Sequence, residues 1–197
     1  MFVNYNYCPC CKKNLLLNFA KIASDCAMPA STVREYYSIL EDTLIGFMLT
    51  PWDKSIKRKA IAAVKFYLFD PGVCHTLAQT QTLDRNSDLY GRSFEHWLAI
   101  ELTSYLSYRR LHYPLHYWRT THQHEVDFIV DDLLAIEVKT TRKVTPQDLK
   151  NLQYLAEEQT IKQLYLVSHD PVPAQYGSIH CVHWQTFIEN LWQDKLI

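Results

Sequence analysis

The stretch EVDFIVDDLLAIEVK, residues 125–139, decides the fold of the second half of this chain. In an extended strand alternate side chains share a face. Apolar residues at 126, 128 and 130 alternate with Glu125 and Asp127, and a second apolar set follows at 134, 136 and 138. The two alternating segments are separated by Asp131 and Asp132. This pattern predicts a β-hairpin in which each strand turns one apolar face toward a core.

Packing of both apolar faces into the same core fixes the register of the hairpin. Asp127 then lies opposite Glu137, and Glu125 lies opposite Lys139. Such pairing requires a loop of odd length around residues 131–133, because a two-residue turn would put the acidic residues on opposite faces. The sequence therefore predicts three carboxylates and one lysine on one face of the sheet.

This acidic face has two interpretations. Like charges opposite one another destabilise a sheet unless something compensates them. Mg²⁺ or Mn²⁺ binds oxygen ligands, often one or two carboxylates plus a phosphate, and promotes phosphodiester hydrolysis, in which a lysine can orient the water or neutralise the phosphate. The alternative is a solvent-facing strand surface on which Lys139 pairs with Glu125 or Glu137. The residues of the hairpin leave both interpretations open.

The segments around the hairpin predict an α/β (or α+β) domain with a mixed sheet. We expect a long helix at 91–111, strands at 115–120, 125–130, 134–139, 163–168 and 179–183, a helix beginning at 145 and a closing helix at 184–192.

Glu95 is a further candidate for the acidic site, because it lies inside the apolar stripe of the long helix. A buried acid is costly unless it is paired or binds a metal. The alternative to a metal is a buried ion pair, for instance with Arg109, Arg110 or Arg119.

The first half of the chain predicts a winged helix-turn-helix. A helix at 14–24 is followed by a second helix, for which Ser31 and Thr32 are candidate N-caps. Two extended segments, 44–49 and 64–69, flank a basic loop. Contact of this loop and of the second helix with the DNA backbone is one interpretation, and a packing module with a solvated basic loop is the other. The candidate nucleic-acid-binding residues are Arg34, Lys54, Lys57, Arg58 and Lys59, together with Arg142 and Lys143 after the hairpin.

These segments predict a lead-in at 1–13, a winged helix-turn-helix at 14–79, a linker at 80–90 and a second domain at 91–197. The chain has 197 residues, 48% of them hydrophobic, which is enough for a core in each domain. Its net charge of −1 restricts nucleic-acid binding to local patches. Its apolar runs are too short for a membrane span, and no signal peptide opens the chain, so we expect a cytoplasmic protein without a membrane partner. No glycine precedes a lysine, which excludes a P-loop for a nucleotide.

Helical Glu95, then Asp127, then Glu137-Val138-Lys139 resembles the PD-(D/E)XK nuclease superfamily. The longer sequence around these residues resembles the C-terminal region of bacterial and archaeal AAA-type ATPases, where a winged helix precedes a nuclease-like domain of unknown function. The matching segments are PASTVREYYSILEDTLIGFML (29–49), KFYLFDPGV (65–73), GRSFEHWLAIEL (91–102), YWRT (117–120) and EVDFIV…AIEVK.

This resemblance implies a restriction-endonuclease-like mixed sheet flanked by helices, with Glu95, Asp127, Glu137 and Lys139 as catalytic residues. The first three would hold Mg²⁺ or Mn²⁺. Because no P-loop is present, we expect a C-terminal remnant of such an ATPase, with DNA as partner and an ATPase subunit in trans as a further one. The function hypothesis is a metal-dependent nuclease acting on DNA phosphodiester bonds. The alternative is a catalytically inactive DNA-binding or protein-interaction module.

Overall fold

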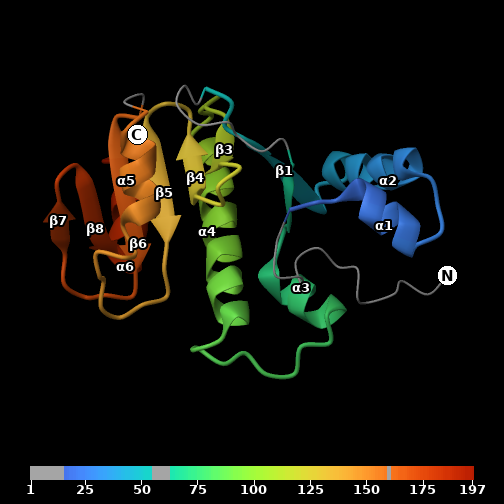
Figure 1. Ribbon diagram of the computed structural model, residues 1–197, viewed down its shortest axis with the longest axis horizontal. Coiled ribbons are helices and arrows are strands. Elements are labelled where there is room, and N and C mark those ends of the chain that lie inside the picture. The colour runs from blue at the N-terminus through green and yellow to red at the C-terminus, as the bar shows by residue number, and fades with distance from the viewer. Residues whose placement is uncertain (1–15, 55–62, 159–160) are drawn as a thin grey trace. The chain divides into compact units, whose positions relative to one another are not determined.

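The computed structural model describes residues 16–54, 63–158 and 161–197, in which six helices and eight strands form a mixed α/β fold (Figure 1). The predicted lead-in at 1–13 and the basic residues Lys57, Arg58 and Lys59 lie outside the described part of the chain. The chain divides into two compact units. The first comprises the residues up to Thr50 together with Ala63–Trp97, and the second comprises Pro51–Ala62 and Leu98–Ile197.

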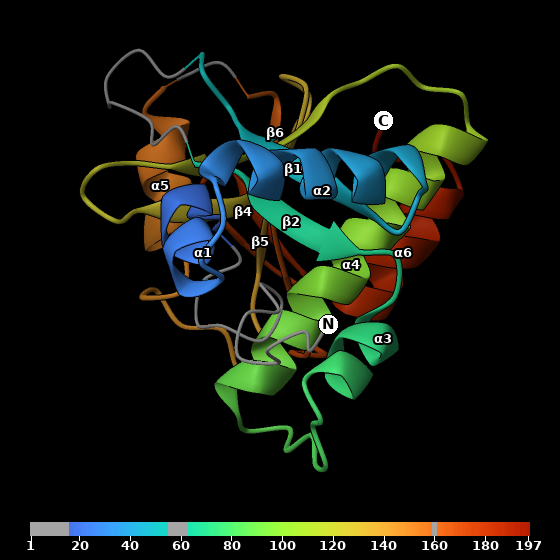
Figure 2. The ribbon, with the colours of Figure 1, turned by 90° about the vertical axis from the view of Figure 1, so that its right-hand side faces the viewer.

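The first unit contains two helices, a hairpin and a third helix, which Figure 2 views from the side of the helices. An aromatic cluster links the first two helices and the hairpin, because the ring of Tyr37 meets Phe19 edge-on at 5.5 Å and Phe66 at 4.9 Å between centroids. Gly46 pairs with Leu68, and a Cβ at position 46 would lie 2.6 Å from the Tyr67 carbonyl oxygen, so no larger residue fits there. The elements are α1 (Phe19–Asp25), α2 (Ala30–Asp42), antiparallel β1 (Gly46–Pro51) and β2 (Lys65–Leu68), and α3 (Pro71–Leu77).

The helix starts in this unit differ from the predicted ones. Helix α2 begins at Ala30 after Pro29, and no side chain caps it, so the predicted capping by Ser31 or Thr32 is wrong. Proline suits a helix start because its missing N–H costs no hydrogen bond there. Helix α1 begins after Asn18, whose side chain accepts a hydrogen bond from the Lys21 N–H at 2.9 Å. Helix α3, capped by Asp70, was not predicted.

The second unit contains a six-stranded mixed sheet in the order β3-β4-β5-β6-β8-β7. Strands β3, β4 and β5 are antiparallel neighbours, whereas β5, β6 and β8 run parallel. The elements are α4 (Asp88–Tyr108), within which the boundary between the units falls, β3 (Leu115–Arg119), β4 (Glu125–Val130), β5 (Leu134–Val138), α5 (Lys150–Ala156), β6 (Gln163–Ser168), β7 (Ala174–Tyr176), β8 (Ile179–His183) and α6 (Trp184–Trp192). The predicted mixed sheet is confirmed, while the short strand β7 was missed.

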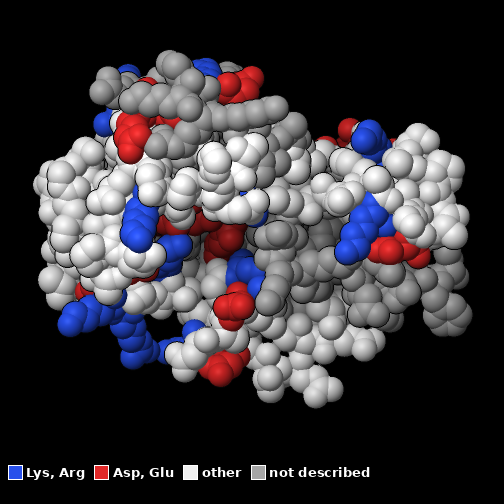
Figure 3. All heavy atoms as spheres, viewed as in Figure 1, with Lys and Arg blue, Asp and Glu red and all other residues white. Residues whose placement is uncertain are grey.

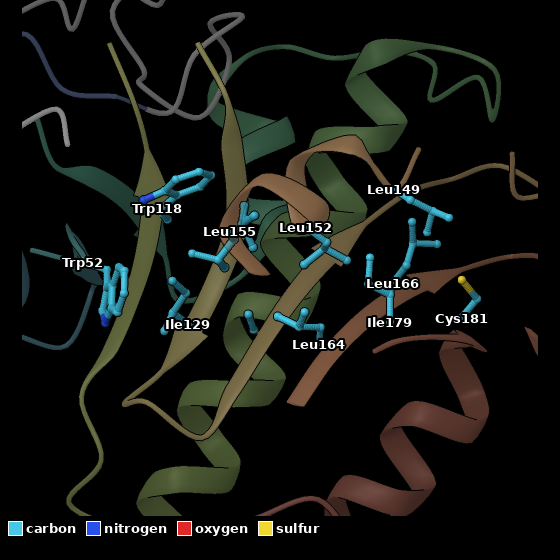
Figure 4. Packing of buried hydrophobic residues seen from close by; sticks show 12 residues of the cluster. Trp52, Trp118, Ile129, Leu149, Leu152, Leu155, Leu164, Leu166, Ile179 and Cys181 are labelled. Carbon is cyan, nitrogen blue, oxygen red and sulfur yellow. The ribbon is translucent and has the colours of Figure 1, made fainter. Parts of the chain in front are cut away.

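Helices α5 and α6 cover opposite faces of this sheet. Leu164 and Leu166 of β6 belong to the buried cluster that includes Leu152 of α5 (Figure 4). The intervening Tyr165 contacts Phe187 of α6, with ring centroids 5.7 Å apart. Because side chains alternate along a strand, the two helices lie on different sides. Ile129 and Val126 of β4 both belong to the cluster on the α5 side, because the β3–β4 register shifts between these two residues and interrupts the alternation of side chains.

Burial in this sheet leads to a first testable prediction. Val167 of β6 is 0% exposed, whereas Val172, after the same strand, is 67% exposed. Removing two buried methyl groups costs their transfer free energy plus a cavity, so Val167→Ala should lower the free energy of unfolding by about 2 kcal/mol. Val172→Ala makes the same chemical change in solvent and should stay within about 0.5 kcal/mol of the wild type. Urea unfolding of both variants measures this difference, and equal losses would contradict the described burial.

Candidate metal centre

The register of the β4–β5 hairpin agrees with the prediction from its apolar faces. Phe128 lies opposite Ile136, and Val130 lies opposite Leu134. The turn consists of residues 131–133, and Asp131 adopts a left-handed conformation with φ of 48°, which aspartate tolerates. The pairing ends at Phe128 and Ile136, and Asp127 and Glu137 are the next residues of the two strands. The predicted odd-length loop is therefore confirmed.

Asp127 is half-buried and is tied to the end of the neighbouring strand. Its Oδ2 atom accepts a hydrogen bond from the Val138 N–H at 2.8 Å. Val138 is the last residue of β5 and stands between Glu137 and Lys139. This bond holds the Asp127 carboxylate beside the two other residues of the predicted site.

Glu137 is the most deeply buried member of the site, with only 1% of the residue exposed. Its Oε1 atom accepts hydrogen bonds from Lys139 Nζ at 2.6 Å and from Asn151 Nδ2 at 3.3 Å. Its Oε2 atom is also buried, yet it has no hydrogen-bond partner among the described residues. A buried acceptor without a partner is costly and rare in native proteins, so this oxygen calls for an explanation.

The charges of Glu137 and Lys139 depend on each other. Burial raises the pKa of the Glu137 carboxyl, Lys139 and Asn151 lower it, Glu125 raises it further, and the net shift is upward. Burial lowers the pKa of Lys139, but attraction by Glu137 and Asp127 outweighs this and raises it above its ordinary value. The lysine is therefore charged at neutral pH. The second interpretation of the acidic face included an ion pair of Lys139 with Glu137, and this pair is confirmed. The same interpretation placed the pair on a solvent-facing surface, which the burial of Glu137 contradicts.

Glu125, the third acid of the hairpin, is held by an arginine that the sequence did not assign to it. Arg119 lies opposite Glu125 in the β3–β4 pairing, and its NH1 atom is 2.7 Å from Glu125 Oε2. Its other terminal nitrogen donates to Gln123. Arg119 is one of the three arginines expected as a partner for Glu95. The turn between 119 and 125 was the available signal, because a β3–β4 hairpin across it brings these two residues together.

Glu95 belongs to the first unit, where it forms a buried ion pair. Its Oε1 atom lies 2.9 Å from Lys65 Nζ and accepts a hydrogen bond from the Tyr67 hydroxyl at 2.7 Å. The ion-pair alternative for Glu95 is thus confirmed, with Lys65 in place of the arginines considered. A role of Glu95 in metal binding stays a prediction.

The candidate nucleic-acid-binding residues lie in different settings. Arg34 is exposed on α2, and its guanidinium stands 5.1 Å from the Phe19 ring centroid. Lys54 pairs with Asp132 at 2.7 Å and Asp131 at 3.5 Å. Arg142 and Lys143 are exposed in the turn after β5. On the face seen in Figure 3 basic and acidic side chains lie interspersed. Nucleic-acid contact by these residues stays a prediction.

Comparison with known proteins finds two families of unknown function. Residues 90–187 match the domain of unknown function DUF4143, and residues 7–84 match the domain of unknown function DUF8612. The similar proteins include "Uncharacterized protein Mb2031c" of Mycobacterium bovis and "Uncharacterized protein Rv2008c" of Mycobacterium tuberculosis. Each is 32% identical over 119 residues, which cover 59% of this chain and 26% of the relative. This chain thus spans about a quarter of the length of these relatives. No solved structure matches. Among the described residues, no helix is long and apolar enough to cross a membrane.

The coupled charges of the site predict the effect of removing its lysine. Lys139→Met leaves the Glu137 carboxylate buried without its cation and should destabilise the fold by about 1–3 kcal/mol, less than for a fully buried pair because the Lys139 side chain is 35% exposed. Adding Glu137→Gln removes the unpaired charge and should recover most of the loss. Urea unfolding measures both, with Lys162→Met as the matched change at an exposed lysine. If Lys139→Met alone were as stable as Lys162→Met, the ion pair of Lys139 and Glu137 would not be coupled to folding.

Proposed function

We propose that the second unit is a divalent-metal-dependent nuclease that cleaves DNA phosphodiester bonds at Asp127, Glu137 and Lys139. The observation that supports this most strongly is the buried Glu137 Oε2 atom, which has no hydrogen-bond partner among the described residues. A strand surface with only a structural role gains nothing from such an atom, whereas a metal ion compensates it directly.

The donor atoms at this place fit Mg²⁺ or Mn²⁺. The carboxylates of Asp127 and Glu137 are hard oxygen ligands, and these ions are typically held by one or two carboxylates with the remaining positions taken by water and phosphate. Asp127 and Glu137 of the second unit would hold the ion. A bound ion of this kind stabilises developing negative charge and lowers the pKa of a bound water.

Lys139 supplies a fixed positive charge beside these carboxylates. Its raised pKa keeps the ammonium protonated at neutral pH, so it acts as a hydrogen-bond donor and not as a base. With 35% of its side chain exposed, it can reach a phosphate that arrives from solvent. In the proposal it neutralises the phosphate oxygens during attack, while Arg142 and Lys143, three and four residues further on, contact the flanking phosphates.

The second candidate function is a DNA-binding module without turnover. The 2.6 Å contact between Lys139 and Glu137 favours it, because a lysine that is permanently engaged by the carboxylate would not serve a substrate. An ATPase acting in trans with either form is a proposal that rests on the sequence resemblance alone.

Removal of single carboxylates tests the catalytic proposal. Asp127→Ala and Glu137→Ala should each abolish Mg²⁺- or Mn²⁺-dependent cleavage of DNA, because each removes a metal ligand. Addition of the ion should raise the melting temperature of the wild type and leave that of both variants unchanged, since only a form that binds the ion is stabilised by it. The measurement is a thermal shift titration followed by cleavage of duplex, branched and single-stranded DNA.

Glu189→Ala is the control for this test, because Glu189 is an exposed acid on α6. It should retain both the thermal shift and the cleavage of the wild type. Cleavage that survives in Asp127→Ala and Glu137→Ala would remove these residues from the active site. A thermal shift without cleavage on any DNA would favour the module without turnover.

The salt dependence of DNA binding tests the contacts of Arg142 and Lys143. If each neutralises one phosphate, the double variant Arg142→Ala/Lys143→Ala should flatten the slope of log K against log salt by about 2, since each contact contributes about 0.9. Fluorescence anisotropy with labelled duplex DNA between about 50 and 200 mM salt measures the slope. Lys195→Ala, at an exposed lysine beyond α6, is the control. An unchanged slope in the double variant would exclude these two residues from the DNA interface.

A further inference from the structure

We propose that Asn151 is a positioning residue for Glu137, which it keeps in place while Lys139 contacts the substrate phosphate. This inference rests on the proposed function, because it concerns the same metal-binding carboxylate. Asn151 lies on α5, outside the E-x-K segment, and its Nδ2 atom is 3.3 Å from Glu137 Oε1.

Two donors from different elements meet on one oxygen of Glu137. Lys139 approaches Oε1 from the end of β5 at 2.6 Å, and Asn151 approaches it from α5 at 3.3 Å. Together they fix the rotation of the carboxylate and leave Oε2 as the buried atom without a hydrogen-bond partner among the described residues. The orientation of the metal-binding atom therefore depends on both donors.

The two donors respond differently to a phosphate. The Lys139 ammonium is charged and partly exposed, so an arriving phosphate attracts it and lengthens its bond to Glu137. The amide of Asn151 is neutral and half-buried, and it is not drawn away in the same manner. Asn151 is thus the donor that remains on Glu137 when Lys139 turns to the substrate.

Helix α5 is held on the sheet without help from Asn151. Leu149, Leu152 and Leu155 are at most 1% exposed and pack in the core of the second unit. Tyr154, one turn after Asn151, contacts His124 with ring centroids 4.1 Å apart. Truncation of Asn151 should therefore release Glu137 and leave the position of the helix unchanged.

The experiment uses the full chain with Mn²⁺ as the probe. Outer-sphere partners of metal ligands typically contribute 10–100-fold to affinity or activity, so Asn151→Ala should weaken Mn²⁺ binding by about that factor in calorimetry. Asn151→Gln retains the amide on a longer side chain and should recover part of the affinity. Asn190→Ala makes the same truncation on α6 and should bind Mn²⁺ like the wild type. The urea midpoints of all three variants should remain near that of the wild type.

The outcomes separate this inference from the function on which it rests. Wild-type affinity in Asn151→Ala overturns the positioning role and leaves the metal site intact. A loss of affinity that Asn151→Gln does not recover, or that Asn190→Ala shares, assigns Asn151 a merely structural role and also overturns it. A wild type that binds no Mn²⁺ overturns the proposed function and the positioning role together.

Discussion

The packing of one apolar face of the β4–β5 hairpin against α5 is the constraint on which the candidate site depends. Ile129 and Ala135 lie in the same buried cluster as Leu152 and Leu155, and this fixes which residues of the two strands face the helix. Because side chains alternate along β5, Glu137 shares the face of Ala135, and the hydrogen bond from Asn151 of α5 agrees with this. Glu137 reaches the interior because it shares a face with a residue that the core requires. A slip of one residue would place it on the opposite side.

The same constraint explains the electrostatics of the site. A carboxylate under a helix loses its water, and this raises the pKa of Glu137. Lys139 and Asn151 compensate only one of its two oxygens. Arg119 neutralises Glu125, so that acid is already satisfied by protein. Glu137 Oε2 is thereby left as a buried oxygen without a hydrogen-bond partner among the described residues.

The sequence predicted the parts of the structure that follow from periodicity. Residues 125–130, 163–168, 179–183 and 184–192 form the elements expected of them, because strand alternation and helical stripes there coincide with burial. The register of the hairpin followed from packing alone. The start of α2 was not predicted from the sequence, because this helix begins after Pro29 without the side-chain cap that was expected. Pairings between distant elements, Lys65 with Glu95 and Asn151 with Glu137, have no local signal and depend on tertiary structure.

A buried ion pair is seldom retained for stability, because apolar residues of similar volume usually serve a core as well or better. The pair of Glu137 and Lys139 is more demanding than most, since it leaves one carboxylate oxygen without a partner among the described residues. Buried polar atoms without hydrogen-bond partners occur typically at functional sites, where the rest of the fold offsets the lost free energy. Here the buried apolar residues of α5 and the central strands supply that stabilisation. The proposed function gives this arrangement a reason, because it assigns a ligand to Glu137.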